Sequence, residues 1–185
     1  MLTYLPLVMQ VVLVLIVMTA GIYDLRFRRI PNWLVLVGLV LGFGLNTFLF
    51  GLSGLERSAM GMGLALLIYF PLYLLRAMGA GDAKLMAAVG AIVGPSNWIV
   101  LFMVTAVLGG IAALAALLFA GRVRKTFWNV CWILHEITHL RAPYQSSEEL
   151  DVRSARAMRL PHGAVIAVGS IVFLAARAYW GGKGL

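Results

Sequence analysis

The chain consists mostly of long runs of apolar residues that are separated by short polar links. An α-helix needs about 20 apolar residues to cross the hydrocarbon core of a bilayer, and most of the runs come close to that length. The pattern therefore predicts an all-α, polytopic membrane protein in which residues 1–185 form a single membrane-embedded domain. The expected membrane-spanning helices cover about residues 4–23, 33–52, 58–75, 83–94, 98–120 and 161–180.

The run at 83–94 is too short for its length alone to decide whether it crosses the membrane. The positions of lysine and arginine decide, because these residues are enriched in cytoplasmic loops. If the run crosses, 12 of the 15 basic residues lie on one side and only Arg57, Arg177 and Lys183 lie on the other. If it dips in and returns, the loop at 121–160 moves to the outside with its seven basic residues. The sequence therefore favours six spans with both termini outside.

The cytoplasmic segment at 121–160 is the one stretch that is not apolar throughout. Residues 125–140 place apolar and aromatic side chains on one face of a helix and charged side chains on the other, which is typical of a helix in the membrane interface. Residues 142–159 are polar and mixed in charge, which is typical of a mobile loop. We therefore expect a cytoplasmic interfacial helix and loop between helices 5 and 6.

The composition supports the membrane assignment and excludes several classes. Hydrophobic residues make up 62% of the chain, whereas soluble domains contain about 45–50% apolar residues. The net charge of +8 is explained by topology rather than by nucleic-acid binding. A single cysteine, Cys131, excludes an internal disulfide and a Cys-x-x-Cys metal cluster. Arginines follow the first run and no basic segment precedes it, so we expect a retained anchor rather than a cleaved signal.

Two aspartates occupy positions where ionisable residues are costly, and such residues in membrane proteins are candidates for function. Asp24 ends the first predicted span and Asp82 begins the fourth, so the expected topology brings both to the cytoplasmic side. Two neighbouring carboxyl groups do not both ionise easily and can share one proton. One could then activate water as a general base while the other protonates a peptide carbonyl oxygen. Helix capping or a role in topology is the alternative for each aspartate.

Two motifs in the chain resemble the signatures of a known family. They are Asp24-Leu25-Arg26-Phe27-Arg28-Arg29-Ile30-Pro31-Asn32 and Gly79-Ala80-Gly81-Asp82-Ala83-Lys84, and Arg159-Leu160-Pro161-His162-Gly163 adds a proline-led start to the last helix. Together they resemble the prepilin peptidases, which are type IV leader peptidases and membrane aspartic proteases of the Gly-x-Gly-Asp type. The order, the spacing and the predicted side of the membrane agree with that family.

The resemblance implies that Asp24 and Asp82 are the catalytic pair. The enzyme would remove the short basic leader from prepilin or pseudopilin precursors at the cytoplasmic face of the bacterial inner membrane, without a metal or organic cofactor. Its partners would be these precursors and membrane lipid, and no nucleic acid. The oligomeric state is left open. The supporting motif positions are Gly79, Gly81, Lys84, Pro31 and Asn32.

The length of the chain narrows the resemblance. Long members of the family carry an N-terminal cytoplasmic region with paired Cys-x-x-Cys motifs, and they also methylate the new N-terminus of the pilin. This sequence has neither that region nor those cysteines, so it resembles the short form that serves tight-adherence (Flp-type) pili. The resemblance therefore does not carry methyltransferase activity over to this chain.

The remaining motif positions have structural interpretations. Gly79 and Gly81 allow a sharp turn and a close approach by another segment. Lys84 follows Asp82 by two residues and points to a different face of a helix, so the spacing does not imply a direct ion pair. Headgroup contact and positioning of Asp82 both stay open for Lys84. Pro31 and Asn32 are expected to organise the start of the second helix.

A second chemistry is suggested by His135-Glu136-Ile137-Thr138-His139. On a helix this pattern places two imidazoles one turn apart, with a glutamate able to act as base on a zinc-bound water. An intramembrane zinc protease using His135, Glu136 and His139 is therefore an alternative. The pattern lies in the segment after the fifth span and has no obvious third ligand beside it, which favours an incidental interfacial helix.

A third class of function needs no hydrolysis. In a transporter or a pilus-assembly subunit, Asp24 and Asp82 would relay protons or fix helix contacts. Cleavage of a leader-bearing precursor separates this class from the two proteases.

Overall fold

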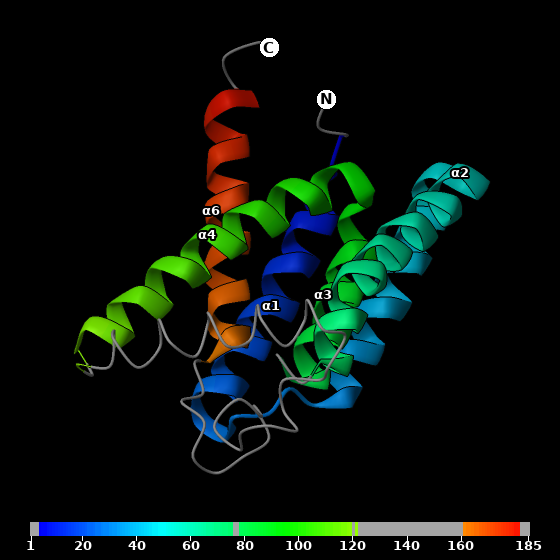
Figure 1. Ribbon diagram of the computed structural model, residues 1–185. Coiled ribbons are helices and arrows are strands. Elements are labelled where there is room, and N and C mark those ends of the chain that lie inside the picture. Colours follow the sequence, from blue (N-terminus) through cyan, green and yellow to red (C-terminus); the bar gives the residue numbers. More distant parts are fainter. Residues whose placement is uncertain (1–3, 76–77, 120, 122–160, 182–185) are drawn as a thin grey trace.

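The computed structural model describes residues 4–75, 78–119, 121 and 161–181, and these form five helices without a strand (Figure 1). The predicted all-α class is confirmed for these residues. The helices are α1 (Leu7–Phe27), α2 (Asn32–Leu74), α3 (Ala80–Val93), α4 (Pro95–Phe119) and α6 (His162–Gly181). The expected interfacial helix and loop at 122–160 lie outside the described residues.

Four of these helices, α1, α2, α4 and α6, are long and apolar enough to cross a membrane, judged by length and composition. Their large apolar side chains point outward in many places. Phe48, Leu52 and Leu67 are 84%, 82% and 72% exposed, for example. Exposed apolar surface on this scale is unfavourable in water and suits contact with lipid. The chain is therefore a membrane protein, while its sidedness and the position of its termini stay predictions.

The helix α2 reverses direction at Gly51, where φ is 63° and ψ is −143°. Its two arms run antiparallel, since Ser58 Oγ on the second arm donates a hydrogen bond to the Gly42 carbonyl on the first, at 3.3 Å. Separate helices were predicted at 33–52 and 58–75 with a polar link between them. The prediction of a non-helical link was wrong, because residues 53–57 are helical and one glycine with positive φ makes the turn.

The short helix α3 lies between the two arms of α2. Gly42 packs against the backbone of Ala91 on one side, where an added Cβ would come within 3.0 Å, and Gly61 packs against the backbone of Gly90 on the other. Glycine permits these approaches because it has no side chain to separate the helices. The chain segment that carries Asp82 is therefore held on two sides by α2.

Polar side chains of neighbouring helices satisfy the carbonyl groups at the end of α3. Asn46 Nδ2 donates to the carbonyls of Ala91 at 2.9 Å and Ile92 at 3.2 Å, and Ser58 Oγ donates to Ala91 at 2.8 Å. The carbonyl of Val93 accepts from Asn97 and Arg57. The last carbonyls of a helix have no partner within it, and lipid offers none. A 14-residue helix can therefore end inside an apolar protein.

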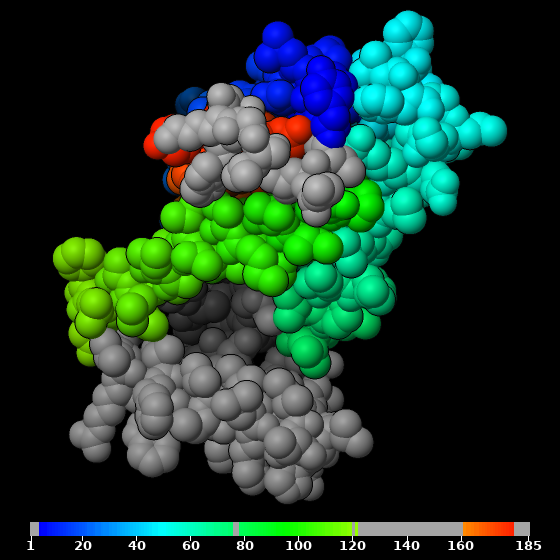
Figure 2. Space-filling view, turned by 90° about the horizontal axis from the view of Figure 1, so that it is seen from above, coloured from blue at the N-terminus to red at the C-terminus, as the bar shows by residue number. Residues whose placement is uncertain are grey.

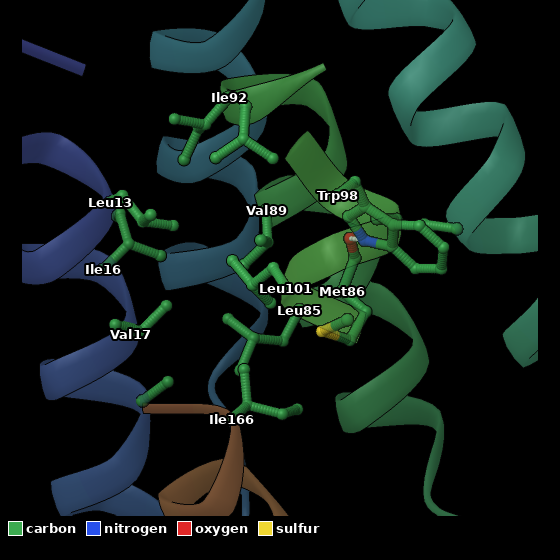
Figure 3. Packing of buried hydrophobic residues seen from close by; sticks show 14 of the residues in the cluster. Leu13, Ile16, Val17, Leu85, Met86, Val89, Ile92, Trp98, Leu101 and Ile166 are labelled. Carbon is green, nitrogen blue, oxygen red and sulfur yellow. Dashed lines mark hydrogen bonds between the residues drawn. The ribbon is translucent and has the colours of Figure 1, made fainter. Parts of the chain in front are cut away.

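Apolar side chains from four helices meet around α3 (Figure 3). Ile16 and Val17 of α1 lie on one side of Val89, and Trp98 of α4 lies on the other (Figure 3). The indole nitrogen of Trp98 donates to the Met86 carbonyl at 3.0 Å, which ties α4 to α3. Residues 85–93 of α3 are all buried, and this packing sets the position of its first turn.

The helix α6 runs antiparallel to α1 and is crossed by α4 (Figure 1). Gly21 of α1 packs against Ala167, and Thr105 of α4 packs against Gly169. The buried residues of α4 all lie in its first half, and the second half extends past α6 along one side of the molecule, as the green to yellow-green surface in Figure 2 shows. The first turn of α6 is thereby brought to the end of α1 where Asp24 lies.

The helix boundaries near the two aspartates matter for the site. Asp24 was expected to end the first helix, but α1 continues to Phe27, and Arg28 closes it in a left-handed conformation with φ of 54°. Asp82 was expected to begin its helix, and it does lie in the first turn of α3, which starts at Ala80. The helical backbone therefore fixes the direction of both side chains.

Candidate active site

The structure brings Asp24 and Asp82 to the same end of the helix bundle. Asp24 lies near the C-terminal end of α1, Asp82 lies in the first turn of α3, and these helices contact each other. Asp24 is only 8% exposed, although it is ionisable. A buried carboxyl group needs hydrogen bonds or a proton to offset its loss of hydration. The surroundings of each aspartate show how this is met.

The pKa of Asp82 is raised to about 7, first by burial and then by the negative charge of Asp24. A hydrogen bond with the backbone of Gly79 acts in the opposite direction. Asp82 precedes the segment expected to cross the membrane at 83–94. Burial and a like charge both disfavour ionisation, so Asp82 can hold a proton near neutral pH. Asp82 can therefore serve as a proton donor beside Asp24.

Asp24 accepts a hydrogen bond from the N-terminus of α6. The Gly163 amide donates to Asp24 Oδ2 at 2.8 Å, across 139 positions in the sequence. The first amides of a helix have no carbonyl partner within it, and their aligned dipoles attract negative charge. Neither hydropathy nor spacing predicts this contact, although the proline-led motif at 159–163 marks the place.

The motif glycines act through close packing rather than through a sharp turn. Gly79 precedes α3 with φ of −74° and ψ of 148°, which any residue can adopt, so the sharp turn expected of glycine is not made at this position. The expected close approach is present at Gly81, where an added Cβ would lie 3.2 Å from the Cβ of Ile30. An added Cβ at Gly79 would lie 3.3 Å from Asp82 Oδ2. Both glycines thus leave room around the Asp82 turn.

Lys84 and Asn32 connect the starts of α3 and α2. The Lys84 ammonium donates to Asn32 Oδ1 at 3.1 Å in an exposed position. Pro31 precedes α2, and its carbonyl accepts the amides of Leu34 and Val35, so it opens that helix. The contact joins the two sequence motifs directly, one at the start of α2 and the other in the first turns of α3.

The residues of the zinc alternative, His135, Glu136 and His139, lie outside the described part of the chain. Within the described ranges, no three His, Cys, Asp or Glu side chains are grouped so that they could hold a metal ion. The zinc alternative is therefore left to experiment.

Comparison with known proteins adds an independent observation. The model of the type IV leader peptidase family matches residues 11–114, which is more than half of the chain. The matched part contains Asp24 and Asp82 and ends before α6. Searches of curated proteins and of solved structures gave no match. The contact between Asp24 and Gly163 therefore lies partly outside the matched region and has to be judged on its geometry.

Proposed function

Since the chain belongs to the type IV leader peptidase family, we propose that it is a membrane aspartic endopeptidase that uses Asp24 and Asp82 to cleave the leader from type IV prepilins. The observation that carries the proposal is that Asp24 and Asp82, from helices far apart in sequence, lie at the same end of the bundle, near enough for the charge of Asp24 to act on Asp82. The raised pKa of Asp82 supports a pair that shares a proton. Flp-type pilins and pilin-like precursors are the proposed substrates.

The proposed reaction needs only water and the two carboxyl groups. The ionised aspartate takes a proton from water, the water oxygen bonds to the peptide carbonyl carbon, and the protonated aspartate gives its proton to the carbonyl oxygen. The resulting gem-diol then collapses. The amide nitrogen takes the proton from the first aspartate as the C–N bond breaks, and a hydroxyl proton returns to the second. Both carboxyl groups regain their starting states.

The substrate would lie across the end of the bundle. A prepilin carries a water-soluble leader followed by an apolar helix, so the leader can stay in the cytoplasm while the helix enters the bilayer beside the spans. We place the site on the cytoplasmic face of the inner membrane, with six spans and both termini outside. The excess of basic residues in the loops on that side supports this topology.

The test is cleavage of a leader-bearing prepilin by membranes that contain the protein. Asp24→Asn and Asp82→Asn are each expected to lower the cleavage rate at least about 100-fold, because each removes one partner of the proton transfer. Glu56→Gln is the matched control. It makes the same change from acid to amide at an exposed residue beside Arg57, whose guanidinium reaches the Tyr4 carbonyl at the far end of α1.

Two further arms separate the alternatives. His135→Ala and a zinc chelator should leave cleavage unchanged if the aspartates do the chemistry. Loss of cleavage with the chelator, together with full activity of both aspartate variants, would contradict the proposal and favour the zinc protease. Wild-type membranes that cleave no precursor would favour the transporter or assembly class.

A further inference from the structure

The two aspartates differ in their hydrogen-bond partners, because Asp24 accepts a hydrogen bond from the first turn of α6. We propose that Gly163 is a positioning residue of the active site, whose backbone amide holds Asp24 as the hydrogen-bond acceptor that activates water. The inference rests on the proposed function, because it assigns a role within the same carboxyl pair. It extends the site to a helix that the family match does not include.

The amide of Gly163 is available because of its place in the helix. Pro161 stands just before α6, and its carbonyl accepts the amides of Ala164 at 3.1 Å and Val165 at 3.2 Å. Gly163 lies in the first turn, where the amides have no carbonyl one turn earlier in the helix. Asp24 supplies the acceptor from another helix, at 2.8 Å in a buried position. The same contact therefore caps α6 and orients the Asp24 side chain.

Glycine at position 163 leaves the room that this contact needs. A Cβ added at position 163 would lie 3.0 Å from Asp24 Cβ and 3.1 Å from Asp24 Oδ2. One turn further along, Gly21 and Ala167 also meet closely, with 3.0 Å from an added Cβ at Gly21 to the Ala167 methyl. The helices α1 and α6 are thus packed tightly beside the carboxyl group, and a side chain at 163 would push Asp24 away from its position.

The hydrogen bond has a direction, and this gives it a chemical effect. An amide only donates, so Oδ2 must accept, and the unpaired amides and aligned dipoles at the start of a helix attract a negatively charged acceptor. The other oxygen, Oδ1, is left to take a proton from water. Asp82 also has a backbone partner at Gly79, but burial and the charge of Asp24 outweigh it. Asp24 is therefore the base, and Asp82 supplies the proton.

The cleanest test replaces glycine at position 163 by glycolate during cell-free synthesis, which exchanges the backbone N–H for an ester oxygen and adds no side-chain atom. We expect kcat to fall about 10- to 100-fold while KM changes less than about threefold, because the change affects the chemical step. The acid limb of the pH–rate profile should move up by about one to two pH units, since a lost hydrogen bond no longer favours the carboxylate. A merely structural role of Gly163 would not move this limb.

Charged neighbours need a control, because they also influence Asp24. In the described part of the chain, Asp82 of α3 and His162 of α6 lie within its electrostatic influence. His162→Gln removes the imidazole and keeps the backbone of α6. The glycolate change should shift the acid limb equally with and without this substitution.

Gly163→Ala tests the role of space, and Gly109→Ala is its matched control. Gly109 of α4 faces the first turn of α6, but its added Cβ would make only ordinary contacts, at 3.5 Å with Val165 and 3.9 Å with His162. We expect Gly163→Ala to lower kcat at least about 10-fold and Gly109→Ala to leave it unchanged. Equal effects of the two substitutions would show that Gly163 contributes only general packing.

A readout without cleavage keeps this inference separate from the proposed function. A water-soluble carbodiimide modifies protonated carboxyl groups, and mass spectrometry of the Asp24 peptide then follows the titration of that group. We expect the glycolate protein to protonate Asp24 at higher pH than the wild type. An unchanged titration would overturn the inference even if the enzyme cleaves prepilin, whereas a shifted titration in a protein without cleavage would contradict only the proposed function.

Discussion

Asn46 offers the sharpest test of how the fold supports the site. It is fully buried on the first arm of α2, and its side-chain amide donates to the carbonyls of Ala91 and Ile92 at the end of α3. Asn46→Ala leaves Ile92 without this donor, while Ala91 still accepts from Ser58. Interhelical hydrogen bonds in membrane proteins contribute about 0.6 to 1.7 kcal/mol each, so the two lost bonds predict a destabilisation of about 1–3 kcal/mol.

Ser58 makes the prediction more specific. Ser58→Ala alone leaves Ala91 with Asn46 as donor, but the double variant removes both donors from that carbonyl. The free energy lost by the double variant should therefore exceed the sum of the two single losses, because a buried carbonyl without any donor costs about 1–3 kcal/mol. Ser53→Ala is the control, since the hydroxyl of Ser53 is exposed and donates to the Phe50 carbonyl of its own helix.

Reversible unfolding by SDS in detergent micelles, followed by far-UV circular dichroism, measures these free energies. The rate of prepilin cleavage, measured in parallel, should decrease most in the variants that lose most stability, since α3 carries Asp82. A stability of Asn46→Ala within about 0.5 kcal/mol of the wild type would refute the reasoning. If the free energy lost by the double variant equals the sum of the two single losses, the idea that Asn46 and Ser58 share the Ala91 carbonyl is refuted.

Three further predictions concern packing and pH. Gly61→Ala should abolish folded protein in detergent, because the new methyl group would collide with the Gly90 carbonyl. Gly63→Ala should be tolerated, because no atom lies within 4 Å of its added Cβ. Size-exclusion profiles compare the two variants, and a normal profile for Gly61→Ala would contradict the packing. The pKa of Asp82 is raised to about 7, which predicts that kcat/KM falls above about pH 7 because the proton donor is lost. A kcat/KM that stays constant to pH 9 would exclude Asp82 as the donor. The same shift favours the protonated folded state, so wild-type stability relative to Asp82→Asn should decrease as pH rises from about 4 to about 7, measured by SDS unfolding at each pH.

The sequence could predict the helices and the candidate catalytic residues because these depend on local properties. Apolar runs near Leu13 and Leu101 predict helices, since each segment gains from lipid contact on its own. The motifs around Asp24 and Asp82 are continuous in sequence and carried the resemblance to the family, which the family match later supported.

The sequence could not predict the partners of the buried polar groups. Asn46 and Ser58 are ordinary residues in apolar runs, and nothing local indicates that they donate to the end of α3. The turn at Gly51 was also missed, because the polar residues after it indicated a longer link. These features depend on which helix lies beside which, and hydropathy measures only the transfer of each segment into lipid.

The sequence by itself thus determined an all-α membrane chain with two aspartates in costly positions. Only the tertiary structure decided that the first turn of α6 meets Asp24 through Gly163 and that α3 is held between the arms of α2. The physical reason is that a buried polar group must find a partner wherever packing brings one. For Asp24 that partner lies 139 residues away, beyond the reach of any local pattern.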